Sequence, residues 1–172
     1  MKINSKKVAF ISVMAALGNL LGLIPLKIPS PSPTVSIELH FSQLPPLLVA
    51  FSLGPISGAI TGLLSLVAVT AIYIRNPFVP FGNMILAGIA GLAARKFKPI
   101  IAGLIGEIAE TPFLWFSVLL WSGVIHNVPF KVLIPIIALI NVKAFIEVFI
   151  SSSIASLLLK KNEIKSALKS IK

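Results

Sequence analysis

The 172-residue chain contains no cysteine and no aspartate, and its five acidic residues are all glutamate. Without cysteine there is no disulfide framework and no thiolate ligand for a metal. The two histidines, His40 and His126, lie far apart in the sequence and cannot form a zinc site without carboxylate ligands. Charged residues make up 12% of the chain, against about 25% in soluble domains. This shortage of charge excludes an ordinary soluble protein.

Sequence motifs of several enzyme classes are also missing. The chain has no aspartate pair for an intramembrane protease, no His-Glu-x-x-His, no phosphate-binding Gly-x-x-x-x-Gly-Lys loop and no Gly-x-Ser-x-Gly nucleophile turn. We therefore expect no enzymatic activity, no metal and no cofactor. Capture or passage of a solute is the expected kind of function.

Apolar residues account for 56% of the chain, and the mean hydropathy is +1.01. Long apolar runs, bounded by proline, glycine and basic residues, are typical of membrane-spanning helices. The sequence predicts an all-α integral membrane protein that forms a single domain over residues 1–172. The six predicted spans are 8–24, 43–53, 56–74, 81–94, 100–120 and 132–159.

Residues 25–42 separate the first two predicted spans and contain four prolines, Pro25, Pro29, Pro31 and Pro33. Proline removes a backbone donor and fixes φ, so this stretch cannot form a regular helix. Long loops in small proteins commonly act as lids or binding elements. The sequence predicts a long extracellular loop that covers a binding site.

Fifteen basic residues give the chain a net charge of +10. With six spans, eleven of them fall on the side of the two termini, whereas only Lys27, Arg75 and Lys131 fall on the other side. The positive-inside rule then places both termini in the cytoplasm of a multi-pass plasma-membrane protein. Because each basic cluster adjoins the end of a span, no nucleic-acid partner is expected. The basic cytoplasmic tail, 160–172, is expected to include an amphipathic helix.

Ionisable residues also occur inside the predicted spans, where each costs about 2.5 to 3.5 kcal/mol on insertion scales. Counting 1.5 Å per residue places Glu110 and Lys143 at about 15 Å depth, with Glu107 and Glu147 nearer the cytoplasm. We expect an ion pair between Lys143 and Glu110, and Asn141 toward the outer mouth of the same cluster. The competing interpretation is that these groups only hold the helices together.

Small and aromatic residues add two further features. The first span carries two pairs of small residues at i and i+4, Ser12 with Ala16 and Gly18 with Gly22, which allow another backbone to approach closely. Tyr73 and Trp121 are interpreted as anchors at the membrane surface. Four other aromatic residues would suit a flat, weakly charged ligand: Phe41, Phe81, Phe113 and Trp115.

Residues 37–45, Ile-Glu-Leu-His-Phe-Ser-Gln-Leu-Pro, followed by 54–58, Gly-Pro-Ile-Ser-Gly, resemble the S components of energy-coupling factor (ECF) vitamin transporters. The segment 80–83, Pro-Phe-Gly-Asn, is also similar to their riboflavin-specific branch. The resemblance implies six helices that capture a vitamin, with riboflavin as the best candidate. It further implies a membrane coupling subunit and two ATPase subunits as partners, contacted through Ser12 and Ala16.

One departure from the family concerns the sixth span. Riboflavin-binding relatives carry an asparagine and a lysine three residues apart, whereas Asn141 and Lys143 here are two apart. The predicted substrate-binding residues are Phe41, Phe81, Asn83, Glu110, Trp115, Asn141 and Lys143. The alternative function is a proton-coupled carrier or small channel that uses Glu107, Glu110 and Glu147 as a relay, and a third is a membrane scaffold without a ligand.

Overall fold

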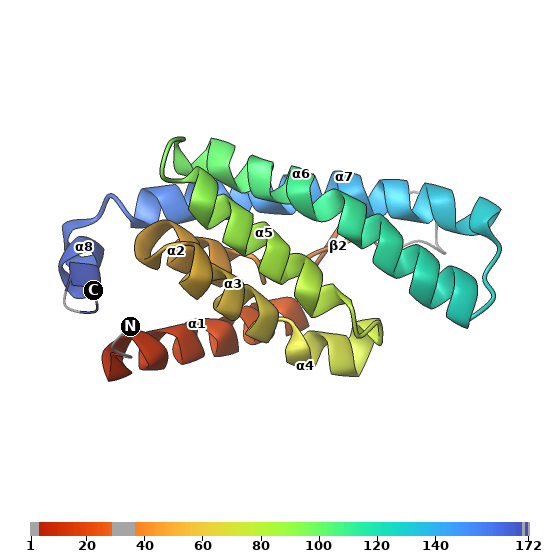
Figure 1. Ribbon diagram of the computed structural model, residues 1–172, viewed down its shortest axis with the longest axis horizontal. Helices are drawn as coiled ribbons and strands as arrows, with labels where there is room; N and C mark the ends of the chain where they lie inside the picture. The colour runs from red at the N-terminus through yellow and green to blue at the C-terminus, as the bar shows by residue number, and fades with distance from the viewer. Residues whose placement is uncertain (1–3, 29–36, 170, 172) are drawn as a thin grey trace.

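The structure is a computed structural model that describes residues 4–28, 37–169 and 171. It is a bundle of helices that run roughly along one long axis (Figure 1). The main helices are α1 (Ser5–Leu23), α2 (Leu44–Leu53), α3 (Pro55–Leu64), α5 (Val79–Ala93), α6 (Pro99–Val118) and α7 (Phe130–Leu158). The shorter elements are α4 (Val67–Val69), the π-helical segments η1 (Thr70–Ile74) and η2 (Leu119–Ile125), and α8 (Asn162–Lys169).

The helix boundaries follow local sequence signals. Asn4 caps α1, because its side-chain oxygen accepts a hydrogen bond from the Lys6 N–H at 3.0 Å. Gly54 ends α2 with φ at 93°, a conformation that glycine adopts without strain. Pro55 and Pro99 occupy the first positions of α3 and α6, where a missing N–H costs no hydrogen bond. Proline and glycine therefore divide the apolar sequence into helices.

Among the described residues, four helical stretches are long and apolar enough to cross a membrane: Ser5–Leu23, Pro55–Ile74, Pro99–Ile125 and Phe130–Leu158. The other two predicted spans correspond to the shorter apolar helices α2 and α5. At 1.5 Å per residue, the ten residues of α2 extend only about 15 Å, half of a hydrocarbon core. The count of six spans therefore stays a prediction.

Two predicted boundaries differ from the structure. The helix predicted over 56–74 is interrupted near Ser65 and Leu66 before it continues through α4 and η1. The helix predicted over 100–120 continues to Ile125, because η2 adds π-helical turns to α6. Residues 122–125, expected to belong to a polar connection, are therefore helical.

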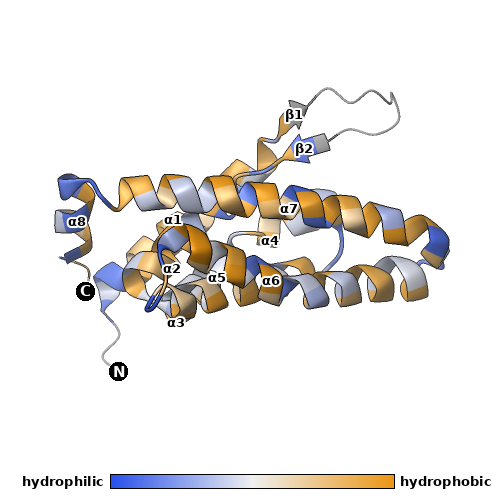
Figure 2. Ribbon diagram, turned by 90° about the horizontal axis from the view of Figure 1, so that it is seen from above, coloured by the Kyte–Doolittle hydropathy of each residue, from blue (hydrophilic) through white to orange (hydrophobic). Residues whose placement is uncertain are grey.

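The connection between α1 and α2 contains a pair of strands that the sequence analysis did not anticipate. Strand β1 (Leu26–Ile28) pairs in antiparallel register with β2 (Ile37–Leu39), with Lys27 opposite Glu38. Figure 2 shows the pair projecting from the side of the helix bundle. The predicted absence of a regular helix in this connection holds for its described residues, whereas residues 29–36 of the predicted lid lie outside them.

The most buried part of the bundle surrounds α2. Leu47 and Val49 of this helix are fully buried, the first against Leu86 of α5 and the second beside Met14 of α1. Helices α3 and α5 approach each other closely at Gly62, where a Cβ atom would collide with the backbone carbonyl oxygen of Asn83. A bundle held together by small residues at helix contacts is typical of membrane proteins.

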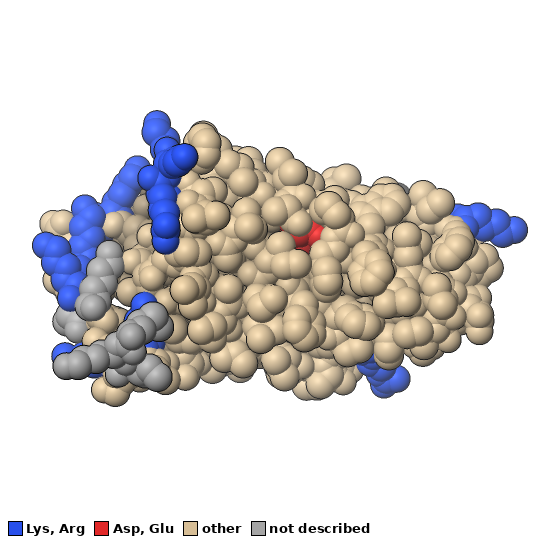
Figure 3. Space-filling view, viewed as in Figure 1, with Lys and Arg blue, Asp and Glu red and all other residues tan. Residues whose placement is uncertain are grey.

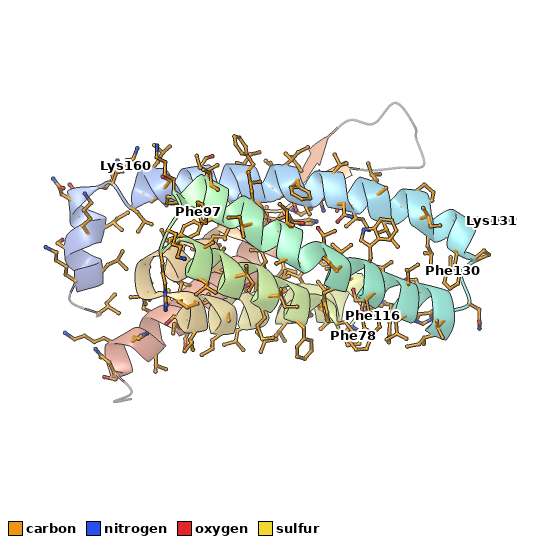
Figure 4. All side chains as sticks on the ribbon, turned by 45° about the horizontal axis from the view of Figure 1, so that its top comes forward. Phe78, Phe97, Phe116, Phe130, Lys131 and Lys160 are labelled. Atoms are coloured by element: carbon orange, nitrogen blue, oxygen red, sulfur yellow. The ribbon has the colours of Figure 1, made fainter. Side chains whose placement is uncertain are left out.

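The two ends of the bundle differ in charge. Lysine and arginine side chains gather at the end that carries the N-terminus and α8 (Figure 3). Lys160 lies near this end and Lys131 at the opposite end of α7 (Figure 4). The predicted tail helix is present as α8, in which Leu168 is buried and the lysines are exposed. An Asn4 side chain that donates to the Ile171 carbonyl at 3.2 Å joins the two ends of the chain.

Candidate functional site

A cavity of about 500 Å³ lies between the start of α5, α6, η2 and the first half of α7. We call it the α6–α7 cavity. Its volume lies within the range of about 300 to 1,000 Å³ that is common for small-molecule sites. Most of its wall is aliphatic, with a few polar and aromatic side chains: Asn76, Glu110, Phe113, Ser117, Trp121 and Ser122. Such a wall suits a ligand with an apolar ring system and several hydrogen-bonding groups.

Glu110 is the acidic residue of this wall. It is 9% exposed, and its Oε2 atom is buried without a hydrogen-bond partner among the described residues. Its other oxygen lies so close to α5 that a Cβ atom at Gly82 would be 2.6 Å from it. A buried carboxyl oxygen without a partner is costly unless a ligand or water supplies one. Glu110 is therefore positioned to bind a hydrogen-bonding group inside the cavity.

Asn76 fixes the wall on the side of α5. Its side chain is 4% exposed, accepts a hydrogen bond from the Phe78 N–H at 3.1 Å and donates to the Ser117 carbonyl at 3.4 Å. The first contact forms the turn that precedes α5, and the second joins this turn to α6. This part of the cavity wall is thus held by hydrogen bonds between the Asn76 side chain and backbone groups.

Trp121 contributes an aromatic ring from η2. Its ring system forms a T-shaped contact with His126, with the ring centroids 4.9 Å apart and an angle of 75° between the planes. His126 itself is exposed in the connection to α7. Trp121 itself lines the α6–α7 cavity, although the sequence suggested a membrane anchor at this position.

A second cavity of about 420 Å³ lies beside the strand pair. We call it the hairpin cavity. It is lined by the end of α1, by Glu38 of β2 and His40 directly after it, and by Tyr73 and Ile74 of η1. Ile74 of η1 lines both cavities, so the two cavities adjoin at this residue.

His40 joins the connection after β2 to two helices. Its backbone N–H donates to Glu147 Oε1 at 2.5 Å, and its ring Nδ1 lies 2.9 Å from the carbonyl oxygen of Gly22. Glu147 Oε1 also lies 3.6 Å from Lys143 Nζ. We call these three contacts the His40 latch. They hold the residue that follows β2 against α7 and the end of α1.

The state of the His40 ring follows from its surroundings. Burial lowers the pKa of this imidazole below its ordinary value of 6.5, and the positive charge of Lys143 lowers it further. The Gly22 carbonyl and Glu38 act in the opposite direction with smaller effects. The ring is therefore neutral near pH 7, and Nδ1 donates its proton to Gly22.

The predicted ion pair between Lys143 and Glu110 is wrong, since among the described residues Lys143 pairs with Glu147 one turn along the same helix. Depth along a helix indicates which residues share a level of the membrane, but it does not give their rotation about the helix axis. Glu107 is fully buried, and neither of its carboxyl oxygens has a hydrogen-bond partner among the described residues. Three of the four ionisable groups predicted inside the bundle are buried, and Lys143 is one-quarter exposed.

The structure does not bring all seven predicted substrate-binding residues together. Asn83 donates to the Gly62 carbonyl at 3.1 Å and to Ser65 Oγ at 2.9 Å, and so joins α5 to α3. Phe81 is exposed and lines a separate hollow beside Arg75. Phe41 and Trp115 are half-buried and line neither of the two cavities described above.

Glu110 is the predicted residue that lines the α6–α7 cavity. Asn141 directly follows Ile140 of its wall and has a buried Oδ1 without a hydrogen-bond partner among the described residues. Lys143 lies one turn beyond Ile140 on α7. Sequence reasoning missed Asn76 and Ser117. An Asn-Pro pair between two apolar runs signals a turn at Asn76, but nothing in the sequence marks Ser117.

The two predicted pairs of small residues in α1 face different ways. Ser12 and Ala16 are exposed, together with their neighbours Val13 and Leu17. Gly18 and Gly22 are buried against Ser65 and Val69 of the same chain. The first pair is therefore available to another molecule, whereas the second pair is used for internal packing.

The fold and the cavities define a class of protein, a helical membrane protein with room for a small molecule at one end of its bundle. Comparisons with known proteins identify the family. Residues 2–160 match the family model described as "ECF-type riboflavin transporter, S component", and the chain belongs to this family. The resemblance noted in the sequence is thereby confirmed. The chain is a substrate-binding subunit of a vitamin transporter and not an enzyme.

A solved structure supports the same assignment. The chain is similar to the one reported as "Structure and mechanism of the S component of a bacterial ECF transporter", with a TM-score of 0.64 and 25% sequence identity. The alignment covers 95% of this chain and 98% of that one. The search of curated proteins returned no match.

Proposed function

We propose that the chain captures riboflavin in the α6–α7 cavity. The observation that carries the proposal is the buried Oε2 of Glu110, which has no hydrogen-bond partner in the described part of the chain and lies in a cavity of about 500 Å³, in a chain of the riboflavin family. The flat ring system of riboflavin would lie against Trp121 and Phe113. Its imide N–H or a hydroxyl of its ribityl chain would donate to Glu110.

The neighbouring hairpin cavity offers space for the second part of the ligand. Riboflavin has an aromatic part and a polyhydroxylated part, and the two cavities meet at Ile74. Tyr73, Glu38 and His40 supply polar groups on the hairpin side. Asn141 and Lys143 stay in the proposed site as polar groups of α7. Phe41, Phe81, Asn83 and Trp115 stay predictions that mutagenesis must decide.

We further propose that residues 25–42 act as the lid of the site and that the His40 latch holds it closed. The latch supports this role because it joins the described end of the segment to α7 and α1. The vitamin would then be released when these contacts break. Both termini would lie in the cytoplasm, supported by the basic side chains gathered at their end of the bundle (Figure 3).

Transport would require partner subunits. The exposed pair Ser12 and Ala16 would contact a membrane coupling subunit, since small residues allow a helix to approach closely. Two ATPase subunits bound to the coupling subunit would supply the energy. Membership of the family supports this arrangement, because an S component captures the substrate and does not hydrolyse ATP.

Titration of purified protein with riboflavin tests the proposal. Riboflavin fluorescence should be quenched on binding, and Glu110→Ala should weaken binding by about tenfold or more, because it removes a hydrogen-bonding group from a buried site. Glu163→Ala, on the exposed helix α8, is the matched control and should bind normally. Tight binding of another vitamin, without binding of riboflavin, would show that the other vitamin is the substrate. No binding across a panel of vitamins would overturn the proposal.

A further inference from the structure

A third cavity lies at the end of the bundle opposite the proposed vitamin site. It has a volume of about 400 Å³ and is bounded by the first turns of α1, by the turn between α2 and α3, and by Arg95 after α5. We call it the basic-end cavity. It shares no wall residue with the α6–α7 cavity or the hairpin cavity. The proposed function gives it no role.

Two cations border this cavity from separate elements, Lys7 of α1 and Arg95 from the connection between α5 and α6. No wall residue is acidic. Among the described residues, neither cation forms an ion pair. Two cations at one cavity attract an anionic group, and arginine in particular is suited to bind phosphate oxygens in a bidentate manner.

The remaining wall is largely apolar and open to the outside of the bundle. Val8, Ile56 and Ile60 line the cavity and are 48%, 64% and 44% exposed. In a membrane protein such side chains contact acyl chains. The cavity therefore combines a cationic part with an apolar part that continues onto the lipid-facing surface. A free anion would contact only the cationic part, whereas a phospholipid would contact the cationic part and the apolar part.

The position of the cavity agrees with this occupant. Lys7 lies in the first turns of α1, and Gly54 and Pro55 form the turn between two apolar helices. Helix ends of this kind lie at the level of lipid headgroups, where basic side chains meet anionic lipids. The basic side chains of the molecule gather at this end (Figure 3).

We propose that the basic-end cavity binds one anionic phospholipid. Its phosphate lies between Lys7 and Arg95, and an acyl chain follows Val8 and Ile60 along the surface of α1 and α3. The occupant is a lipid of the same leaflet as the basic end, and its binding does not depend on which vitamin the protein captures.

Native mass spectrometry of the full chain, released from detergent, tests this proposal with two lipids of identical acyl chains, phosphatidylglycerol and phosphatidylcholine. We expect one phosphatidylglycerol to bind preferentially. Lys7→Gln combined with Arg95→Gln should weaken this binding by roughly 25-fold, since each cation near an anionic headgroup contributes about fivefold. The matched control is Lys160→Gln with Lys161→Gln, which removes the same charge from the same end but outside the cavity.

Several results would overturn the proposal. Equal losses in the two double variants would indicate diffuse surface charge, and equal binding of the two lipids would remove the phosphate contact. Displacement of the lipid by glycerol phosphate at comparable concentration would indicate a site for a free anion. If phosphatidylglycerol does not bind and the cavity variant alone loses association with the coupling subunit, the cavity is a protein contact.

The apolar part of the site has its own pair of variants. Ile60→Asn should weaken binding of both lipids, whereas Ile108→Asn, on the exposed surface of α6 and outside the cavity, should not. Equal effects of the two substitutions would contradict the proposed acyl-chain contact. Riboflavin binding should be unchanged in all of these variants, which shows that they are folded and separates this proposal from the proposed function.

Discussion

Two regions of the bundle are built from similar apolar helices but are packed differently. Between α3 and α5, Gly62 brings one helix against the backbone of the other, and Asn83 joins the two by hydrogen bonds. Between α6, η2 and α7, larger side chains and two π-helical segments leave a cavity of about 500 Å³. We therefore call the first region the frame, and only the second region has the space that the proposed ligand needs.

The largest expected effect concerns the exposed surface of α1, a helix that packs against α3 of the frame. Ser12→Trp or Ala16→Trp should abolish uptake in cells that also express the coupling and ATPase subunits, because a large ring prevents close approach of a partner helix. Riboflavin binding by the purified variants should be unchanged. Val13→Trp is the matched control on a neighbouring exposed face of α1. Equal loss of binding and uptake would indicate that the pair is needed for internal packing.

The next effect concerns the interior of the frame. Gly62→Ala should lower the free energy of unfolding by about 3 kcal/mol, because the added methyl group meets a backbone carbonyl that cannot move aside. Gly88→Ala is the matched control, since its Cβ would lie 3.3 Å from the Ala59 side chain and should cost less than about 1 kcal/mol. Denaturation in detergent measures both. Similar losses in the two variants would contradict the close backbone contact at Gly62.

Variants of the two tryptophans compare a residue of the cavity wall with a residue outside it. Trp121→Leu should weaken riboflavin binding by about three- to tenfold, because it removes an aromatic contact in the cavity wall. Trp115→Leu should have little effect, although the sequence pointed to Trp115 as the substrate-binding residue. Fluorescence titration compares the variants. A larger loss at Trp115 would favour the sequence-based assignment over the geometry.

The smallest expected effect is a pH dependence of vitamin release. Because burial lowers the pKa of His40, the closed latch binds a proton more weakly than the open segment does. The latch is therefore fully stabilised above the ordinary pKa of 6.5 and weakens as the pH falls below it.

Stopped-flow measurement should show that riboflavin dissociates progressively faster as the pH falls below 6.5. His40→Asn should remove this dependence. A wild-type rate that is unchanged between neutral and mildly acidic pH would contradict the role of the latch.

Much of the helical frame could be predicted from the sequence, because it depends on local signals. Pro55, Pro99 and Gly54 mark helix ends, and apolar runs between them set the helix positions. The pairing of β1 with β2 could not be predicted in this way. Strand pairing depends on contacts between residues distant in the sequence, and the proline content of the segment pointed only to a loop.

The candidate site was only partly predictable for a related reason. Burial of Glu110 followed from its place within an apolar run, but its partner depended on how α6 and α7 are rotated about their axes. Trp121 lies within η2 and lines the cavity wall, a placement that its position near the end of a predicted span did not indicate. Tertiary packing decided both features.

The central claim is that riboflavin occupies the α6–α7 cavity, and the absence of native cysteine allows a direct measurement of it. Ser122→Cys places a single thiol in the wall of this cavity, and Ser12→Cys places one on the exposed surface of α1. Saturating riboflavin should slow alkylation of the first by about tenfold or more, on the scale of a drug-sized ligand that buries most of its surface, and leave the second unchanged. Equal alkylation rates of Ser122→Cys with and without bound riboflavin would contradict the account.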